Sequence, residues 1–125
     1  MPIIRKYKGK LEILEELSDG SFHVRHQDGS ESWQDKEGNL HRVGKPAVVR
    51  NDGTEEWYTR GLRHRIDGPA YLRTFKNQIG ETLSERMWYL QDKRLNTFEV
   101  EGWLEKGSID LSTDEGQTLF IARFA

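Results

Sequence analysis

Two histidines, His41 and His64, are the residues of this chain whose type and placement could hold a metal or move a proton near neutral pH. Each precedes an arginine, and each stands at the same place in one of two similar segments. Equivalent turns could bring them together with Asp67 or Glu56 as a metal or acid–base site. Alternatively, each His-Arg pair hydrogen-bonds backbone groups of its own segment. We favour this structural role, because a residue that recurs with a motif is usually part of its fold.

Other residue types that carry chemistry form no recognisable site. At strand spacing, His23 and His26 would lie on opposite faces, which makes a poor metal pair. The chain has no cysteine, so disulfides, thiolate catalysis and cysteine-bound zinc are excluded. It also lacks a phosphate-binding glycine loop and a serine-nucleophile turn. We therefore expect no catalytic residue, no metal and no cofactor, and the protein is predicted not to be an enzyme.

Two arginines, Arg42 and Arg65, directly follow the paired histidines. Each is expected to form an ion pair with a neighbouring carboxylate, such as Asp67 or Glu55. The alternative is a ladder of guanidinium groups that reads phosphate or an acidic protein surface.

The composition fits one folded domain with a thin core built from aromatic side chains. The 125 residues are 34% hydrophobic and 32% charged, but 4 Trp, 4 Tyr and 5 Phe argue against disorder. Residues 41–94 carry 11 basic and 7 acidic groups, whereas residues 95–125 carry 2 and 6. The net charge of −2 gives no bulk attraction to nucleic acid or to a membrane. No apolar run approaches the roughly 20 residues of a membrane span, so we expect a cytoplasmic protein without membrane contact.

A sequence repeat is the strongest signal. The pattern Asp-Gly-x-Glu-x-Trp fits residues 52–57, and residues 28–33 carry the same Asp-Gly, Glu and Trp positions. Later in each copy follow His-Arg and a Gly-Pro-Ala or Gly-Lys-Pro-Ala sequence. A degraded third copy starts at Met87, and Asp92 stands near its expected glycine. The residues expected to shape these copies are Trp33, Trp57, Trp88, His41, His64, Gly68 and Pro69.

The full pattern of the second copy is Asp-Gly-x-Glu-x-Trp-Tyr-x-x-Gly-x-x-His-Arg-x-x-Gly-Pro-Ala, from Asp52 to Ala70. It resembles the MORN-like repeats of phage, giant-virus and bacterial proteins. The first copy, residues 28–47, lacks the tyrosine and is one residue longer at two places. The resemblance covers residues 28–95 and implies short hairpins laid side by side in an elongated meander. It implies architecture far more than function.

We predict a mainly β fold: an elongated antiparallel meander of repeated β-hairpins, as a single-layer or solenoid-like sheet, with one or two short C-terminal helices. Asn51-Asp52-Gly53 is a tight-turn signal between strands at 47–50 and 55–58, and a third short strand starts at Leu62. A lone copy cannot bury its aromatic face, whereas stacked copies can. The expected single domain, residues 1–125, comprises a β cap at 1–27, two and a half hairpin copies at 28–95 and a helical cap at 96–125.

The N-terminal cap is predicted to be β. Leu11, Leu14 and Leu17 would also fit a short helix, but Gly9 and Gly20 bracket a run that is short enough for a strand. Residues 22–25 alternate apolar and polar side chains, as an amphipathic strand does.

The C-terminal cap is predicted to hold two helices. Asn96-Thr97 can begin a helix that ends at Gly107, although Gly102 weakens this prediction and one more decayed hairpin is the alternative. The expected inner face is Phe98, Val100, Trp103 and Leu104. A capping box at residues 112–115 begins a second helix, with Leu119, Phe120, Arg123 and Phe124 following and Gly116 counting against it.

The function class expected from these features is a protein-interaction module. One face of a thin sheet can stay open, and tyrosine and arginine are favoured at binding hot spots. The residues expected to form the surface are Arg60, Arg63, Arg73, Tyr58, Tyr71 and Tyr89. The expected partner is a protein, and a phage-encoded modulator or inhibitor of a host defence protein fits the resemblance. Nucleic-acid binding by the basic middle and a metal-dependent enzyme using His41 and His64 are the alternatives. Open sheet edges allow a monomer or an edge-paired dimer.

Overall fold

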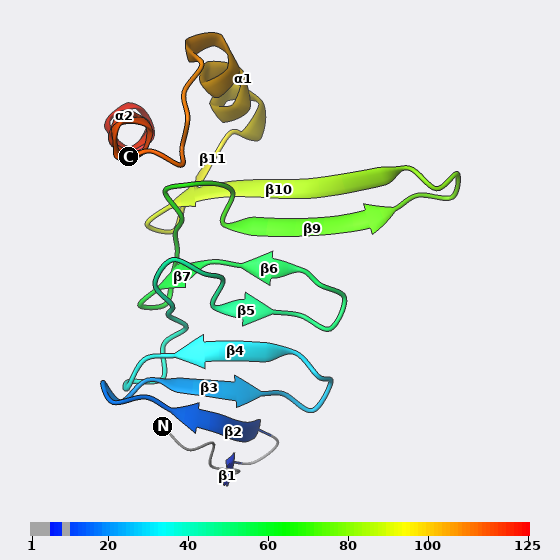
Figure 1. Ribbon diagram of the computed structural model, residues 1–125, viewed down its shortest axis with the longest axis vertical. Coiled ribbons are helices and arrows are strands. Elements are labelled where there is room, and N and C mark those ends of the chain that lie inside the picture. Colours follow the sequence, from blue (N-terminus) through cyan, green and yellow to red (C-terminus); the bar gives the residue numbers. More distant parts are fainter. Residues whose placement is uncertain (1–5, 9–10) are drawn as a thin grey trace. The chain divides into compact units, whose positions relative to one another are not determined.

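The computed structural model describes residues 6–8 and 11–125 (Figure 1). The chain is mainly β, with an antiparallel meander and two C-terminal helices, as predicted. It divides into two compact units between Leu62 and Arg63, inside the second copy of the sequence motif.

The first unit is a meander in which each strand pairs antiparallel with the next (Figure 1). The strand predictions at 11–17 and 22–25 and the hairpin around Asn51 are therefore confirmed. The strands are β1 (Lys6–Lys8), β2 (Leu11–Glu16), β3 (Phe22–Arg25), β4 (Glu31–Gln34), β5 (Val48–Val49) and β6 (Glu55–Glu56). A small hairpin of β7 (Tyr58–Thr59) and β8 (Leu62–Arg63) follows.

The hairpin turns of the first unit share one backbone pattern. In the turn from β5 to β6, the Arg50 amide donates to the Thr54 carbonyl at 2.8 Å, and the Gly53 amide donates to the Arg50 carbonyl at 2.9 Å. Gly53 has a φ of 88°, a left-handed conformation that glycine adopts without strain. The Asp52 carboxylate accepts from the Thr54 amide at 2.8 Å. The Asp-Gly of the sequence motif therefore closes the hairpin and sets the strand register.

The interior of the first unit is small and combines polar side chains with one buried tryptophan, Trp57. One buried cross-strand row joins Val24, Ser32, Val48 and Glu56 in register. Glu56 is 1% exposed, and its carboxylate accepts from Arg50 Nε at 2.8 Å. The ion pair matters because an unpaired buried carboxylate is costly. Of the aromatic residues expected in the core of this unit, Trp57 is buried, at 8% exposed, and Trp33 is half-buried. The short strands also bring hydroxyl, methyl and carboxylate groups together.

The second unit joins a long hairpin to two helices (Figure 1). Strand β10 pairs with β9 along Thr82–Met87 and with β11 along Trp88–Leu90, both antiparallel. The elements are β9 (Tyr71–Lys76), β10 (Thr82–Leu90), β11 (Lys93–Leu95), α1 (Thr97–Gly107) and α2 (Asp114–Phe124).

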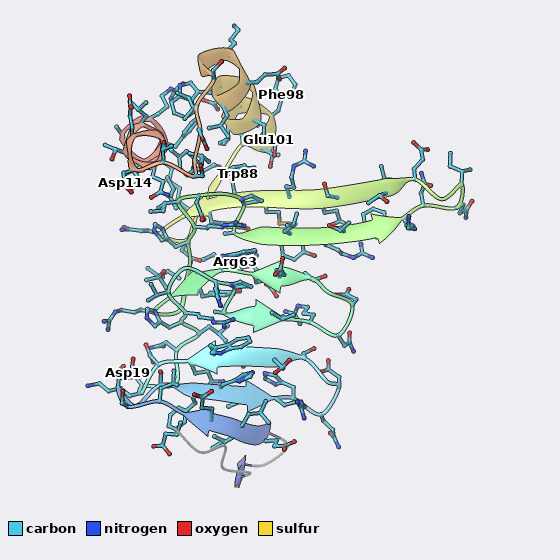
Figure 2. All side chains as sticks on the ribbon, viewed as in Figure 1. Asp19, Arg63, Trp88, Phe98, Glu101 and Asp114 are labelled. Carbon is cyan, nitrogen blue, oxygen red and sulfur yellow. The ribbon has the colours of Figure 1, made fainter. Side chains whose placement is uncertain are left out.

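Helix α1 has the predicted bounds, but one residue of its predicted inner face is wrong. Asn96 caps its start by accepting from the Glu99 amide at 2.8 Å, and a left-handed residue with a φ of 48°, Ser108, ends it. Val100 is buried, whereas Phe98 is 88% exposed. Figure 2 shows Phe98 projecting from α1. The reason is helical phase: two residues turn the side chain by about 200°, so both cannot face inward.

Helix α2 begins one residue later than the predicted capping box. Thr113 is the N-cap, because its hydroxyl accepts from the Gly116 amide at 3.0 Å. The hydroxyl of Ser112 donates instead to the Asp110 carboxylate at 2.7 Å. The prediction of a second helix is confirmed, and the N-cap residue within it is corrected.

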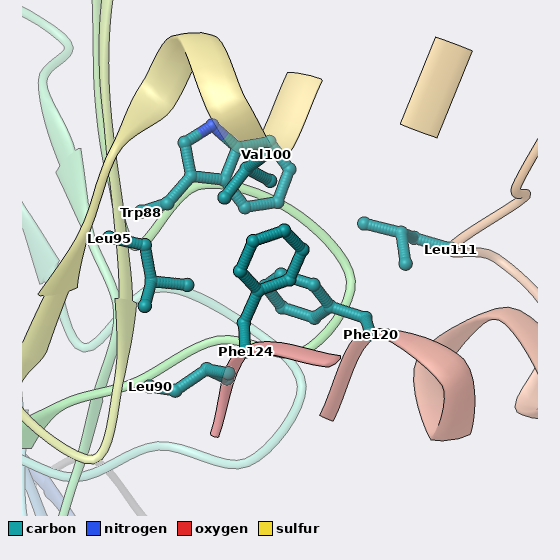
Figure 3. Close-up of a cluster of buried hydrophobic side chains, with 7 residues drawn as sticks. All are labelled: Trp88, Leu90, Leu95, Val100, Leu111, Phe120 and Phe124. Carbon is teal, nitrogen blue, oxygen red and sulfur yellow. The ribbon is translucent and has the colours of Figure 1, made fainter. Parts of the chain in front are cut away.

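The helices bury an aromatic core against the end of the sheet in the second unit (Figure 3). Trp88 meets Phe120 edge-on at 5.6 Å between ring centroids, and Phe120 is fully buried. Offset and edge contacts of this kind add to the free energy of apolar burial. The buried cluster is Trp88, Leu90, Leu95, Val100, Leu111, Phe120 and Phe124.

The two helical glycines predict opposite effects of alanine on stability. A Cβ at Gly116 would lie 1.9 Å from the Asp110 carbonyl oxygen, whereas a Cβ at Gly102 meets nothing within 4 Å. Gly116→Ala should therefore lower the free energy of unfolding by about 2–3 kcal/mol or more. Gly102→Ala should raise it by about 0.5–1 kcal/mol, because alanine favours the helix. Urea unfolding followed by tryptophan fluorescence measures both, and a neutral Gly116→Ala would contradict the packing described.

Candidate functional site

A three-residue segment of the first unit, Leu40–Arg42, clamps the turn between β7 and β8. The Nδ1 atom of His41 accepts from the Arg60 amide at 3.0 Å. The Gly61 amide donates to the Leu40 carbonyl at 2.8 Å, and the Arg42 amide donates to the Tyr58 carbonyl at 3.2 Å. Arg60 and Gly61 have φ values of 49° and 85°. The clamp therefore pairs the amides of a left-handed turn.

The second unit contains the same arrangement. Nδ1 of His64 accepts from the Gln91 amide at 2.9 Å. The Asp92 amide donates to the Arg63 carbonyl at 2.7 Å, and the Arg65 amide donates to the Tyr89 carbonyl at 3.3 Å. Gln91 and Asp92 have φ values of 47° and 69°. Asp92 thus takes the left-handed position that glycine holds in the first clamp, as its place in the sequence suggested.

The histidines of the two clamps are hydrogen-bond acceptors of the backbone, which is the kind of role predicted for them. One detail is corrected: each ring bonds the turn of the following sequence copy, not a group of its own segment. Because an accepting Nδ1 carries no proton, the neutral ring with Nε2–H fits each clamp. Burial lowers the pKa of His64 below its ordinary value of 6.5. No group of three His, Asp or Glu side chains in the described chain could hold a metal ion.

The two arginines that follow the histidines behave differently. Arg65 pairs with the Asp67 carboxylate at 2.7 Å, as expected, and donates to the Pro69 carbonyl at 3.0 Å. A Cβ at Gly68 would lie 2.7 Å from the guanidinium carbon of Arg65, so a larger residue there would displace this guanidinium group.

Arg42 lies over the Trp33 ring, with its guanidinium carbon 3.8 Å from the ring centroid. It also donates to the Pro46 carbonyl at 3.3 Å. The expected carboxylate pair with Asp67 or Glu55 is replaced here by a cation–π contact. His23 stacks on the same indole with ring centroids 4.2 Å apart, and Trp33 remains half-buried.

The predicted binding residues of the second unit form separate contacts. Arg63 lies over the Tyr89 ring at 5.4 Å, and its NH1 donates to the tyrosine hydroxyl at 3.5 Å. Arg73 pairs with Glu85 at 2.6 Å. Tyr71 is half-buried on β9, two residues before Arg73.

The predicted binding residues of the first unit are Tyr58 and Arg60. The Tyr58 hydroxyl donates to the buried Glu56 at 3.4 Å, and Arg60 is exposed in the clamped turn. Arg63 and Tyr89 are two of the six predicted residues that contact one another, and both lie next to the His64 clamp. The prediction of one aromatic and basic surface stays a prediction.

An open groove on the outer side of α1 is a site that the sequence reasoning missed. It has a volume of about 780 Å³. Phe98, which is 88% exposed, and Gly102 lie four residues apart along this side, about one helical turn. The residues that line the groove are Phe98, Glu99, Gly102, Trp103, Glu105 and Lys106.

A charged anchor also fixes α1 to β10. The Glu101 carboxylate accepts from Arg86 Nε at 2.7 Å and Arg86 NH2 at 2.8 Å. It also accepts from the Trp88 indole at 3.0 Å. The Arg86 hydrogen bonds lower the pKa of Glu101, and the Trp88 bond adds to this against the opposing effect of burial. Because the buried Val100 lies about 160° around the helix from both Phe98 and Gly102, these two residues face outward.

One signal in the sequence could have located this face. Gly102 interrupts an otherwise ordinary helical stretch, and its low helix propensity alone weakens the prediction of a helix. With the helix present and capped, the same glycine instead marks an open position on it. Helical phase around Val100 and Leu104 then places Phe98 on the outer side.

Comparisons with protein-family models, curated proteins and solved structures find no match. The resemblance to MORN-like repeats therefore stays a prediction that rests on the sequence pattern. Across residues 6–8 and 11–125, no helix has the length and apolar character needed to span a membrane.

The His64 clamp predicts a pH dependence of stability. Its folded-state pKa lies below the ordinary value of 6.5, so the unfolded chain binds the proton more readily. The free energy of unfolding should fall as the pH drops below about 6.5, and His64→Asn should lack this part because its amide oxygen accepts without titrating. Urea unfolding between about pH 7.5 and 5.5 measures it. Identical pH profiles for the two proteins would contradict the role of the ring.

Proposed function

We propose that this protein is a protein-interaction module without enzymatic activity, and that the outer face of α1 is its contact surface. The observation that carries the proposal is Phe98, 88% exposed beside the open backbone of Gly102. Large aromatic residues are enriched at binding hot spots, where they fill pockets of a partner.

Neither residue contributes to folding in the way that its neighbours do. Val100 is fully buried and Glu101 is anchored, whereas Phe98 leaves its ring in water. Burying such a ring contributes about 1.5–3 kcal/mol, and this free energy would be gained when a partner covers the ring. Gly102 costs the helix about 1 kcal/mol relative to alanine. Its Cβ position is open, so nothing in the described chain requires glycine there.

The charge distribution favours protein binding over the nucleic-acid alternative. Arg50, Arg65, Arg73 and Arg86 each lie within 2.8 Å of a carboxylate oxygen. Ion pairs of this kind neutralise much of the basic charge that a phosphate backbone would need. The identity of the partner as a host protein, a phage origin and a cytoplasmic location stay predictions from the sequence.

Photo-crosslinking tests the proposed surface in the cells that make the protein. Phe98 is replaced by p-benzoylphenylalanine, which keeps an aromatic ring at that position. A discrete crosslinked protein is expected, because the ring would lie within a partner contact. The matched control places the same group at Ile79, an apolar residue that is 79% exposed in the turn between β9 and β10. No product at 98, or the same products at both positions, would contradict the proposal.

The captured partner then allows a measurement of affinity. Phe98→Ala should weaken binding about thirtyfold, which corresponds to about 2 kcal/mol for a hot-spot aromatic. Its free energy of unfolding should stay within about 0.5 kcal/mol of the wild type, because the side chain is 88% exposed. Ile79→Ala should change neither quantity. Isothermal titration calorimetry and urea unfolding give the two numbers.

A further inference from the structure

We propose that the α1 groove binds a short segment of another protein that carries one bulky apolar side chain flanked by lysine or arginine. This inference rests on the proposed function and adds the chemistry of the partner. Two properties of the groove lead to it: the gap at Gly102, and the excess of carboxylates around it.

The gap at Gly102 explains the apolar side chain. Phe98 and Trp103 line the same groove as this glycine, so aromatic surface lies next to exposed backbone. A Cβ at position 102 would meet no atom within 4 Å, which leaves room for an incoming group directly against the helix. Trp103 is held by an edge contact with Phe124 at 5.3 Å between ring centroids. An aliphatic or aromatic side chain seated over Gly102 would therefore contact a preformed surface.

The charges around the groove explain the basic flanks. Residues 95–125 carry 6 acidic and 2 basic groups. Two of the acids already have arginine partners: Glu101 pairs with Arg86, and Glu99 lies 3.5 Å from Arg123. Among the residues that line the groove, the carboxylates are Glu99 and Glu105, against the single cation Lys106. The field near the two helices thus attracts a cationic segment.

A second copy of this chain fits the groove less well than a short segment does. Helix α1 has 11 residues and is about 16 Å long, so one helix-to-helix contact falls well short of the about 800 Å² per partner of a stable interface. Two such faces would also bring like-charged carboxylates together, which is unfavourable. A peptide-sized occupant meets both constraints.

Selection from a display library of random 12-residue peptides tests the inference on the purified full chain. Peptides that also bind Gly102→Leu, in which a side chain fills the gap, are removed. We expect the enriched peptides to share one bulky apolar residue and at least two lysines or arginines. A synthetic peptide of this type should bind the wild type at least tenfold more tightly than Gly102→Leu or Phe98→Ala.

Charge reversal tests the second half of the inference. Glu105→Lys should weaken the synthetic peptide about two- to fivefold, the range of an exposed ion pair, and should reduce the loss of affinity with rising salt. The matched control is Glu81→Lys, which makes the same charge change in the turn between β9 and β10 and should leave affinity unchanged.

Three outcomes would overturn the inference. The first is enrichment of acidic or uncharged peptides. The second is that the peptides bind the Phe98→Ala and Gly102→Leu variants as tightly as the wild type. The third is self-association through Phe98 in sedimentation experiments, with no peptide binding. If crosslinking at position 98 in cells still captures a partner, the proposed function survives such a result and only the partner chemistry fails. If crosslinking also fails, both proposals fail.

Discussion

The fold depends on pairing the backbone amides of two left-handed turns. A turn with positive φ at consecutive residues directs its amides away from its own strands, so they need an acceptor from elsewhere in the chain. In each unit a histidine Nδ1 and a neighbouring carbonyl supply it, at His41 with Leu40 and at His64 with Arg63. The turn residues are exposed, so each bond contributes the modest free energy of a solvent-accessible hydrogen bond and mainly fixes the position of the turn. Histidine fits this position because its short side chain places the Nδ1 atom next to the turn amide with few rotatable bonds.

The same backbone pattern supports two different interiors. In the first unit, cross-strand pairing places Ser32 and Glu56 in the buried row, and the carboxylate needs Arg50 to be tolerated. In the second unit, the two helices add Phe120 and Phe124 over Trp88, so apolar burial dominates. The polar interior of strands is directional and fixes register, whereas the aromatic cluster is compact and supplies more free energy per residue. One chain therefore combines specificity from hydrogen bonds with stability from a small apolar core.

The sequence predicts elements that depend on local turn and capping residues. It does not predict contacts that side chains from distant segments determine. Turn chemistry at Asn51-Asp52-Gly53 predicted the hairpin, although its strands are shorter than the predicted 47–50 and 55–58, and the cap at Asn96 predicted α1 with its observed bounds. The acceptor role of His41 and His64 followed from their recurrence, but their partners lie in the next copy, which spacing alone does not reveal. The proposed binding arginines could not be judged from sequence, because the carboxylate that neutralises Arg73 comes from the partner strand. Apolar character alone places Phe98 on the inner face of α1, whereas helical phase places it on the exposed face.

The two helical glycines show why a residue type has no meaning without its surroundings. Both counted against a helix at the level of propensity, and both lie in one. Gly116 is required by packing, since the Asp110 carbonyl occupies the space of its Cβ. Gly102 has no such neighbour. It lowers the stability of the helix, and no packing contact in the described chain compensates for this. Gly102 therefore lowers helix stability without a structural reason, and it lies one turn from an exposed phenylalanine. Natural chains show this pattern where function rather than folding selects the residue.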